Sequence, residues 1–370
     1  MLPEEREKMI VPSFVERVVK SCLRIGKDDR VTIFAWRHML DLAEALAVEC
    51  ERSGARVHTE FTTDDLWYDA VLNRPIDYLE TPDPFNLALA GIATACIFIS
   101  GPENPERLKG VPAERWMALS RADRPSYEKL LERGVRIADI NLGYVTPQRA
   151  RTYGFDYQAW KKNVEEAIDV EYERMQELGR RVADVLEKSH DVIITDPDGT
   201  DLSFALEGRK AHVYDGVIDD TDVEMRTTYA NLPGGYVAVA ATETNANGVL
   251  SSSVPFAQLG TLIHRIDLRF EKGKLTSFEG DKNIDVLKDM WKKGTGDKDK
   301  IGWLAIGLNP KANLGFLNNQ IVLGTATVGI GFNKELGGTN ESDYALSVTV
   351  GKPTVKLDGK TIIKQGKLAL

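Results

Sequence analysis

The chain has 370 residues, of which 42% are hydrophobic and 28% are charged, and its formal net charge is −9. These values describe an ordinary globular protein of about two domains, and the negative charge argues against nucleic acid as the main partner. No apolar run approaches the ~20 residues that a membrane span requires, and residues 1–14 lack the pattern of a signal peptide. We therefore expect no membrane partner.

Three cysteines, Cys22, Cys50 and Cys96, lie far apart in the sequence and form no C-x-x-C pair. Cys22 and Cys96 have apolar neighbours, which is typical of buried free thiols. Free thiols persist in reducing compartments. The cysteines therefore favour a cytoplasmic protein.

The first half of the chain alternates segments typical of strands and of helices. Strands are expected at 30–36, 55–62, the second part of 88–100 and 135–143, and helices at 38–54 and 124–134. This alternation predicts a mainly parallel sheet flanked by helices. A single long helix is expected over residues 156–190, because the segment has a helical apolar period and no proline.

From about residue 191 the chain consists mostly of short strand-like segments separated by Asp-Gly and Glu-Gly turns. One helix is expected there, at 283–294. The fold class is therefore α/β plus β-rich. We expect an N-terminal α/β domain at 1–185 and a C-terminal, predominantly β domain at 186–370.

The usual catalytic motifs are absent from the chain. Its five histidines show no metal-ligand spacing, and H-E-x-x-H, G-x-S-x-G and the phosphate-binding P-loop do not occur. His264, in the segment "LGTLIHRIDLRF", is expected within a strand and is the histidine most suited to a site. The acidic run 215–224 does not have the spacing of a calcium loop and is expected to be a solvated loop.

Four segments of the second half resemble the M29 aminopeptidases, of the aminopeptidase T and aminopeptidase S type. They are 199–209, 231–250, 301–312 and 321–350, and residues 145–162 of the first half fit as well. The resemblance implies a two-domain, usually dimeric protein whose β-rich domain carries a two-metal site facing an internal cavity. It also implies a homodimer as the assembly.

The residues at the family's metal-site positions differ from the family pattern. The two glutamate positions hold Tyr236 and Trp303, and a histidine position holds Gly329. The family's tyrosine position, seven residues later, holds Leu336. The positions of the family's closing His-x-Asp pair hold Ala345 and Ser347. Zinc or cobalt requires carboxylate and imidazole ligands. The resemblance therefore predicts a lost dinuclear site, with no metal and no other cofactor.

A related branch, the 2,5-dihydroxypyridine dioxygenases, holds one iron with two histidines and an aspartate. His264 could match one of these histidines, but its partners would fall near Ala345 and Ser347. These two residues cannot bind iron. A mononuclear iron site is therefore not expected either.

Polar and aromatic groups beside the replaced positions are the candidates for a rebuilt site. A metal-free reaction would use a histidine or carboxylate as base and a tyrosine or asparagine to stabilise charge. The candidates for catalysis are Tyr236, His264, Asp343 and Tyr344, and those for substrate binding are Glu243, Trp303, Asn309 and Asn340.

Three functions are compatible with this pattern. The first is a metal-independent enzyme acting on a small amino-acid-like or peptide-like molecule in an internal cavity. The second is a non-catalytic binding homologue, and the third is a metal-dependent aminopeptidase with ligands not recognised above. Convergence of Tyr236, His264 and Asp343 on one cavity would favour the first over the second.

Overall fold

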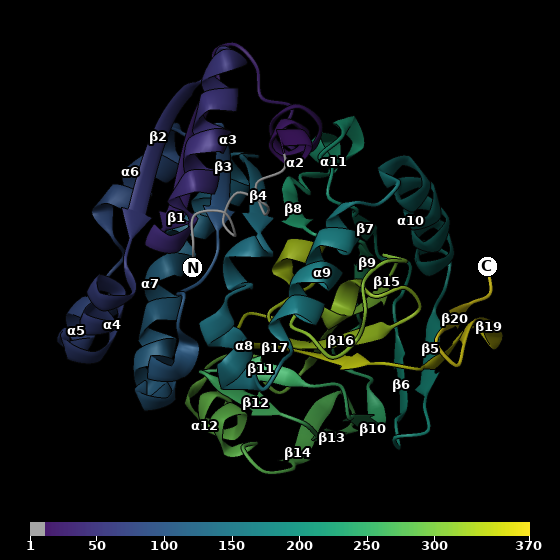
Figure 1. Cartoon of the computed structure of the whole chain (residues 1–370). Coiled ribbons are helices and arrows are strands. Elements are labelled where there is room, and N and C mark those ends of the chain that lie inside the picture. Colours follow the sequence, from purple (N-terminus) through teal and green to yellow (C-terminus); the bar gives the residue numbers. More distant parts are fainter. Residues whose placement is uncertain (1–11) are drawn as a thin grey trace. The chain divides into compact units, whose positions relative to one another are not determined.

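The computed structural model describes residues 12–370, which form two compact units (Figure 1). The first contains the described residues up to Ile168 together with Gly216–Gly234, and the second contains Asp169–Asp215 and Gly235–Leu370. The sequence predicted a single domain boundary at residue 185, whereas the chain passes between the two units three times. The segment 216–234 returns to the first unit because it supplies that unit's last strand.

The first unit is built on sheet A, whose five strands are all parallel and lie in the order β2-β1-β3-β4-β8. The strands are β1 (Arg30–Trp36), β2 (Arg56–Thr62), β3 (Ala95–Ile99), β4 (Arg136–Ile140) and β8 (Tyr229–Leu232). The predicted parallel sheet in the N-terminal α/β part is confirmed.

Helices cover both faces of sheet A, as right-handed crossovers on the two sides of β1 require. α3 (Leu40–Arg52) packs on β1 and β2, whereas α6 (Pro84–Ile92) and α7 (Ala113–Glu132) pack together over a core that includes Cys96 and Ile137. The other helical segments are α2 (Pro12–Glu16), η1 (Arg17–Cys22), η2 (Arg37–Met39), α4 (Asp64–Asn73), α5 (Ile76–Leu79), η3 (Pro105–Gly110), η4 (Asn141–Tyr144), α8 (Pro147–Tyr153), α9 (Tyr157–Ile168) and α11 (Asp220–Met225). Cys22, Cys50 and Cys96 are buried free thiols, as expected.

Two predictions about helices are wrong. The single helix over 156–190 is two helices, α9 and α10 (Tyr172–Glu187), and the break at 169–171 coincides with the division between the units. The acidic run 215–224 is partly helical, because α11 begins with a capping box in which Asp219 and Asp222 each accept the other's backbone N–H, at 3.1 and 2.9 Å.

The second unit is predominantly β, as predicted, and its sheets are antiparallel. Sheet B has the order β14-β13-β10-β6-β5-β18-β19-β20, sheet C has the order β17-β16-β15-β9-β7, and β11 pairs with β12. The strands of sheet C are β7 (Ala211–Tyr214), β9 (Tyr236–Ala240), β15 (Ile301–Gly307), β16 (Ala326–Gly331) and β17 (Ala345–Val350). The remaining elements are β5 (Asp191–Thr195), β6 (Asp201–Ala205), β10 (Asn247–Ser252), β11 (Phe256–Gln258), β12 (Thr261–Ile263), β13 (Ile266–Glu271), β14 (Lys274–Gly280), α12 (Asp285–Lys293), η5 (Asn319–Ile321), η6 (Lys334–Leu336), β18 (Thr354–Leu357), β19 (Lys360–Lys364) and β20 (Lys367–Leu368).

Helix α10 packs against one face of sheet C through an apolar stripe. Its buried residues recur every three or four positions, namely Tyr172, Met175, Gly179, Val182, Ala183 and Leu186. Gly179 lies so close to β7 that a Cβ there would be 2.6 Å from a methyl group of Val213. Across residues 12–370, no helix is long and apolar enough to cross a membrane.

Candidate functional site

Three positions that the resemblance assigns to metal ligands lie side by side on sheet C. In the strand register, Trp303 of β15 is opposite Gly329 of β16, and Gly329 is opposite Ser347 of β17. Directly opposite residues of antiparallel strands project from the same face of the sheet. We refer to Trp303, Gly329 and Ser347 as the Trp303 row. Ala345 is two residues before Ser347 and therefore lies on the same face.

The Trp303 side chain lies across Gly329. A Cβ on Gly329 would be 2.1 Å from the nearest indole atoms, so glycine is the residue that leaves room for the ring. Trp303 and Ser347 are both partly exposed, and β17 is an edge strand of sheet C. The row therefore has a partly exposed indole on the central strand β15 and a partly exposed hydroxyl on the edge strand β17.

The two faces of sheet C differ in composition. The face with the Trp303 row carries small and polar side chains, including Ala238, Ala305 and Thr327, whose hydroxyl is 2.9 Å from that of Thr349. The opposite face is apolar and buried, and it is formed by Val237, Val239, Leu304, Ile306, Val328, Ile330, Leu346 and Val348. Both faces are therefore largely buried, and on the face with the Trp303 row the side chains of Trp303, Ala345, Ser347 and Thr349 remain partly or fully exposed.

The residues present do not fit a dinuclear metal site. The Trp303 row, Tyr236 and Ala345 offer no carboxylate and no imidazole. Within residues 12–370, moreover, no group of three or more histidine, cysteine, aspartate or glutamate side chains is placed to hold a metal ion. We therefore derive no reaction step through a metal.

A buried polar cluster lies at the end of this row. Glu243 is 5% exposed and accepts hydrogen bonds from both terminal nitrogens of Arg209, at 2.7 and 2.8 Å. It also accepts from the side-chain amide of Asn333 at 3.0 Å and from the backbone N–H of Thr339 at 2.8 Å. Burial alone would raise the pKa of Glu243, but these hydrogen bonds outweigh it and lower the pKa to about 2.

The same cluster ties three segments of the second unit together. Asn333 donates to the carbonyl of Gly302 at 2.9 Å and accepts from the backbone of Asn340 at 2.8 Å. Asn340 donates to the carbonyls of Ile301 and Gly331, both at 2.9 Å. We refer to Arg209, Glu243, Asn333, Thr339 and Asn340 as the Glu243 cluster. Because Gly302 precedes Trp303, the cluster fixes the start of β15 and thus the position of the Trp303 row.

Tyr236 is the first residue of β9 and lies at the end of the β9–β15 pair away from Trp303. It is opposite Gly307 and Tyr214, and its ring stacks on that of Tyr214 with centroids 4.7 Å apart. Ala240, four residues further along β9, is the residue opposite Trp303. Four strand residues span about 13 Å, so Tyr236 does not contact the Trp303 row.

Asp343 and Tyr344 precede β17, at the end of sheet C that holds the Glu243 cluster. Asp343 accepts the backbone N–H of Thr295 at 2.6 Å. Tyr344 is 2% exposed and packs against Gly294, and its hydroxyl has no hydrogen-bond partner in the described part of the chain. Burial raises the pKa of Tyr344 above its ordinary value, so this phenol is protonated at neutral pH.

His264 and Asn309 lie outside the Trp303 row. The expectation that His264 lies within a strand is wrong, because β12 ends at Ile263 and the next strand begins at Ile266. His264 is exposed, and its backbone N–H donates to Asp281 at 3.3 Å. Asn309 is buried, and its side-chain oxygen accepts the backbone N–H groups of Lys311 and Ala312, so it shapes a loop.

The structure therefore brings some of the predicted residues together and separates others. Glu243 and Asn340 meet through Asn333, close to Trp303, but Tyr236, His264 and Asp343 do not share one environment. The prediction missed Arg209 and Asn333, which bind Glu243 from 34 and 90 positions away in sequence. No local spacing indicates such pairs. Only the requirement that a buried carboxylate be paired could have suggested a search for them.

Comparison with known proteins agrees with this architecture. Residues 10–314 match the family model described as thermophilic metalloprotease (M29). The chain is 23% identical to aminopeptidase AmpS of Bacillus subtilis over 70% of its own length and 71% of the relative's. It is 24% identical to aminopeptidase T of Thermus thermophilus, over 82% and 80% of the two chains.

Two solved structures share the fold. Wild-type AmpT from Thermus thermophilus matches with a TM-score of 0.75 at 19% identity, over 97% of this chain and 98% of the other. The 2,5-dihydroxypyridine dioxygenase from Pseudomonas putida KT2440 matches with a TM-score of 0.64 at 16% identity, over 97% and 96% of the chains. The family match covers most of the chain, and the chain therefore belongs to the M29 family of thermophilic metalloproteases.

Proposed function

We propose that this M29-family protein binds a small amino-acid-like or peptide-like molecule at the Trp303 row without a dinuclear metal site. Under this proposal, the protein does not hydrolyse peptides through a metal-activated water. The observation that supports this proposal is the register of Trp303, Gly329 and Ser347, which aligns the three positions on one face with no metal-ligating group.

Two metal-free functions remain, and the geometry favours binding over catalysis. A base and a charge-stabilising group must both reach the reacting atoms. Tyr236 and Asp343 lie near opposite ends of sheet C, and His264 is on an exposed turn between β12 and β13. No pair of these three residues forms such an arrangement.

The Trp303 row supplies groups that suit an amino-terminal ligand. An indole face attracts an ammonium group and packs against apolar side chains. The partly exposed Ser347 hydroxyl can donate or accept a hydrogen bond. The Glu243 cluster supports this surface by holding the start of β15, and we place Glu243 and Asn340 in that positioning role.

Metal content and peptidase activity test the proposal. Protein purified without chelator should contain far less than one equivalent of zinc or cobalt by mass spectrometry. It should also release no p-nitroaniline from leucine p-nitroanilide, with or without added Zn²⁺ or Co²⁺. Calorimetric titration with leucine-containing dipeptides should detect binding that Trp303→Ala weakens at least fivefold. Trp291→Ala, which removes another partly exposed indole of the same unit, is the matched control.

A metal-dependent aminopeptidase is the second candidate, because the family model and the relatives carry that activity in their names. Near-stoichiometric zinc or cobalt together with cleavage of leucine p-nitroanilide would establish it. The same result would overturn the proposal above.

We also propose a homodimer in the cytoplasm. The family resemblance supports the dimer, and three buried free cysteines support a reducing compartment. Light scattering should give about twice the chain mass of 41.1 kDa. A monomer mass would contradict the dimer.

A further inference from the structure

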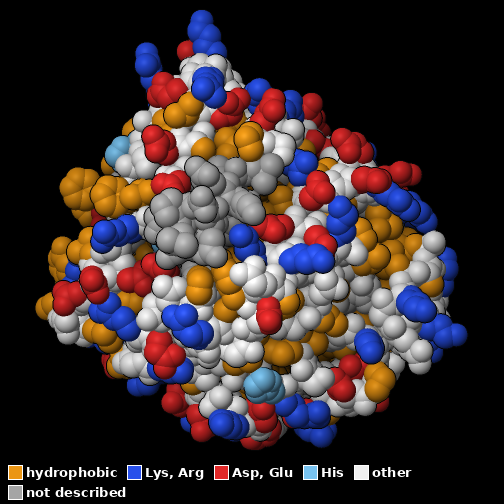
Figure 2. Space-filling view, viewed as in Figure 1, with side chains coloured by type: hydrophobic (Ala, Val, Ile, Leu, Met, Phe, Trp, Pro, Cys, Tyr) orange, Lys and Arg blue, Asp and Glu red, His pale blue; other side chains and the backbone are white. Residues whose placement is uncertain are grey.

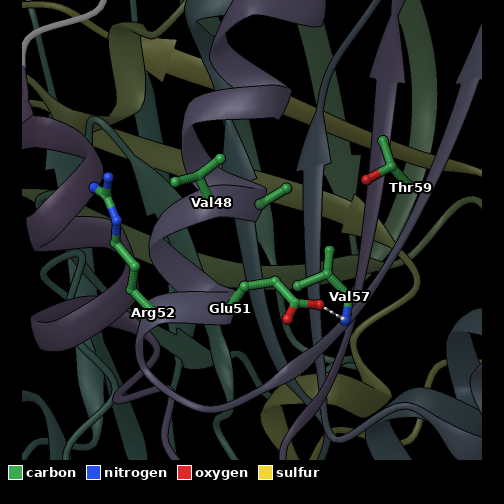
Figure 3. Close-up of a pocket in the computed structure, with 6 residues that line it drawn as sticks. Val48, Glu51, Arg52, Val57 and Thr59 are labelled. Carbon is green, nitrogen blue, oxygen red and sulfur yellow. Dashed lines mark hydrogen bonds between the residues drawn. The ribbon is translucent and has the colours of Figure 1, made fainter.

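Among the described residues of the first unit, two depressions differ in their chemistry. One lies between α3 and β2, has a volume of about 580 Å³ and is shown in Figure 3. Its residues are Ala47, Val48, Glu51, Arg52, Val57 and Thr59. The Glu51 carboxylate in this groove already accepts the Val57 backbone N–H at 3.3 Å, and Arg52 pairs with Glu49 at 3.6 Å. Its charged groups are therefore engaged within the protein.

The second depression, of about 260 Å³, lies at the carboxyl ends of β1, β2 and β3. In the sheet, β1 lies between β2 and β3. After β1 the chain therefore forms β2 on one side of β1 and then crosses over to form β3 on its other side. In open parallel sheets, the crevice outside such a reversal is the usual ligand-binding position. We refer to this depression as the β1–β3 pocket.

Five of the eleven residues that line the β1–β3 pocket are aromatic. They are Phe34, Trp36, Phe61, Phe98 and Tyr144. Phe34 and Phe98 stack with centroids 4.8 Å apart and an interplanar angle of 5°. Gly101 lets Tyr144 approach, because a Cβ at this residue would be 2.1 Å from the phenol ring, and its φ of +88° also favours glycine.

Glu60 is the one ionisable acid among the lining residues, and none of those described there is a lysine or arginine. It is opposite Phe34 in the strand register. No residue from 12 to 370 forms a hydrogen bond or an ion pair with its carboxylate. Glu60 is solvent-exposed. The desolvation of the part of its carboxylate that neighbouring groups cover raises its pKa, the nearby Asp83 raises it further, and His58 opposes these effects. The pocket therefore has an acid whose negative charge is not compensated by the fold.

Ser100 adds an acceptor to the same pocket. Its hydroxyl donates its proton to Asp139, which also accepts the hydroxyl of Tyr229 at 3.0 Å. A serine hydroxyl has one proton and two lone pairs, so Ser100 can offer a ligand only an acceptor. Glu60 and Ser100 therefore suit a ligand that donates hydrogen bonds, and the Thr62 hydroxyl of the same lining can accept one as well.

We infer that the β1–β3 pocket binds a small organic cation, with an ammonium or guanidinium head and an apolar or aromatic body. Aromatic rings beside a carboxylate are a recurring arrangement for such cations. A phosphorylated ligand does not fit, since no basic side chain faces it. The volume equals that of about nine liquid waters, which suits a ligand with one ring. This site lies wholly within the first unit and does not depend on the function proposed for the Trp303 row.

Phenethylamine, which is cationic at pH 7, and its neutral analogue 2-phenylethanol form a matched pair of probes. Titration of the full chain by calorimetry should show saturable 1:1 binding of the amine and at least tenfold weaker binding of the alcohol. Glu60→Gln should weaken amine binding at least tenfold. Glu44→Gln, which neutralises an exposed acid on α3, should leave it unchanged. The indole N–H signal of Trp36, assigned with Trp36→Phe, should shift in NMR spectra on titration.

Two further arms decide between this pocket and the Trp303 row. The amine binding that Glu60→Gln weakens should persist in Trp303→Ala, whatever the Trp303 row itself contributes. Loss of binding in Trp303→Ala but not in Glu60→Gln would assign the amine to sheet C and overturn the inference. Equal binding of the alcohol, or no saturable binding of the amine at millimolar concentration, would also overturn it.

Discussion

The Glu243 cluster and the Trp303 row are neighbours on sheet C, and they use polar residues in opposite ways. In the cluster, each carboxylate oxygen of Glu243 meets a donor from the protein itself. In the row, the indole of Trp303 and the hydroxyl of Ser347 remain partly exposed. Figure 2 shows one face of the molecule, on which charged side chains are spread widely among apolar ones.

In the function that we propose, this difference separates residues that hold the site from residues that contact the ligand. A buried charged group whose partners all belong to the protein fixes those partners in place, and removing one member of the pair is strongly destabilising. A partly exposed group can contact another molecule. Glu60 in the first unit follows the same distinction, because desolvation of part of its carboxylate raises its pKa whereas hydrogen bonds lower that of Glu243.

The largest effect is expected from Glu243→Gln. The change removes the charge that pairs with Arg209 and should lower the free energy of unfolding by about 3 kcal/mol. Urea unfolding followed by tryptophan fluorescence measures this loss. Glu341→Gln is the control, because the Lys334–Glu341 pair is exposed, and it should cost under about 0.5 kcal/mol. Equal losses in both variants would contradict the structural role of the cluster.

Gly329→Ala tests the packing of the Trp303 row. The added Cβ would meet the indole, and overpacking of this kind costs roughly 2 kcal/mol. The double variant Gly329→Ala/Trp303→Ala should recover most of the loss caused by the alanine at 329. Thermal unfolding of the two single variants and the double variant gives the coupling energy. Additive effects would mean that the ring does not occupy this space.

Acid should reveal the Glu243 cluster through a change in stability with pH. The folded pKa of Glu243 is about 2, below the ordinary glutamate value of about 4.3. Its contribution is therefore complete above about pH 4.3 and is lost as pH falls toward 2. The stability difference between the wild type and Glu243→Gln should shrink across this window. A difference that is constant between pH 7 and pH 3 would show that the Glu243 pKa is not lowered.

The smallest effect is expected from Tyr344→Phe. The Tyr344 hydroxyl is buried without a partner in the described chain. Its removal should therefore leave the free energy of unfolding unchanged or raise it by up to about 1 kcal/mol. Tyr68→Phe removes a hydroxyl that donates to Asn104 at 2.7 Å and should cost about 1 kcal/mol. A clear loss in Tyr344→Phe would mean that this hydroxyl has a partner and belongs with the satisfied cluster.

Local sequence pattern predicted much of the fold but little of the site. The strand at 30–36 is β1 with the same bounds, because a continuous run of β-branched and aromatic residues identifies a buried parallel strand. The break in the helix at 169–171 was not predicted, since the helical period continues on both sides. It depends on α9 and α10 contributing to different units.

Site residues were harder to predict because their roles depend on partners far away in sequence. Glu243 and Asn340 have the chemistry of binding residues, and their hydrogen bonds in the structure go to other groups of the protein. Glu60 did not stand out at all, because nothing near it in sequence marks the end of β2 as the wall of a pocket. Its place in a pocket depends on the pairing of β1 with both β2 and β3, which sets Phe34 opposite Glu60 on one side and opposite Phe98 on the other.

The sequence by itself determined the fold class and the family. These follow from side-chain chemistry and short-range periodicity, which are written in the chain order. Only the tertiary structure decided that Trp303 fills the space above Gly329 and that Arg209 pairs with Glu243 while Asn333 donates a hydrogen bond to it. It also decided that Glu60 has no hydrogen-bond or ion-pair partner among residues 12–370. Burial, pairing and clearance depend on residues that are distant in sequence, so they exist only once the chain has folded.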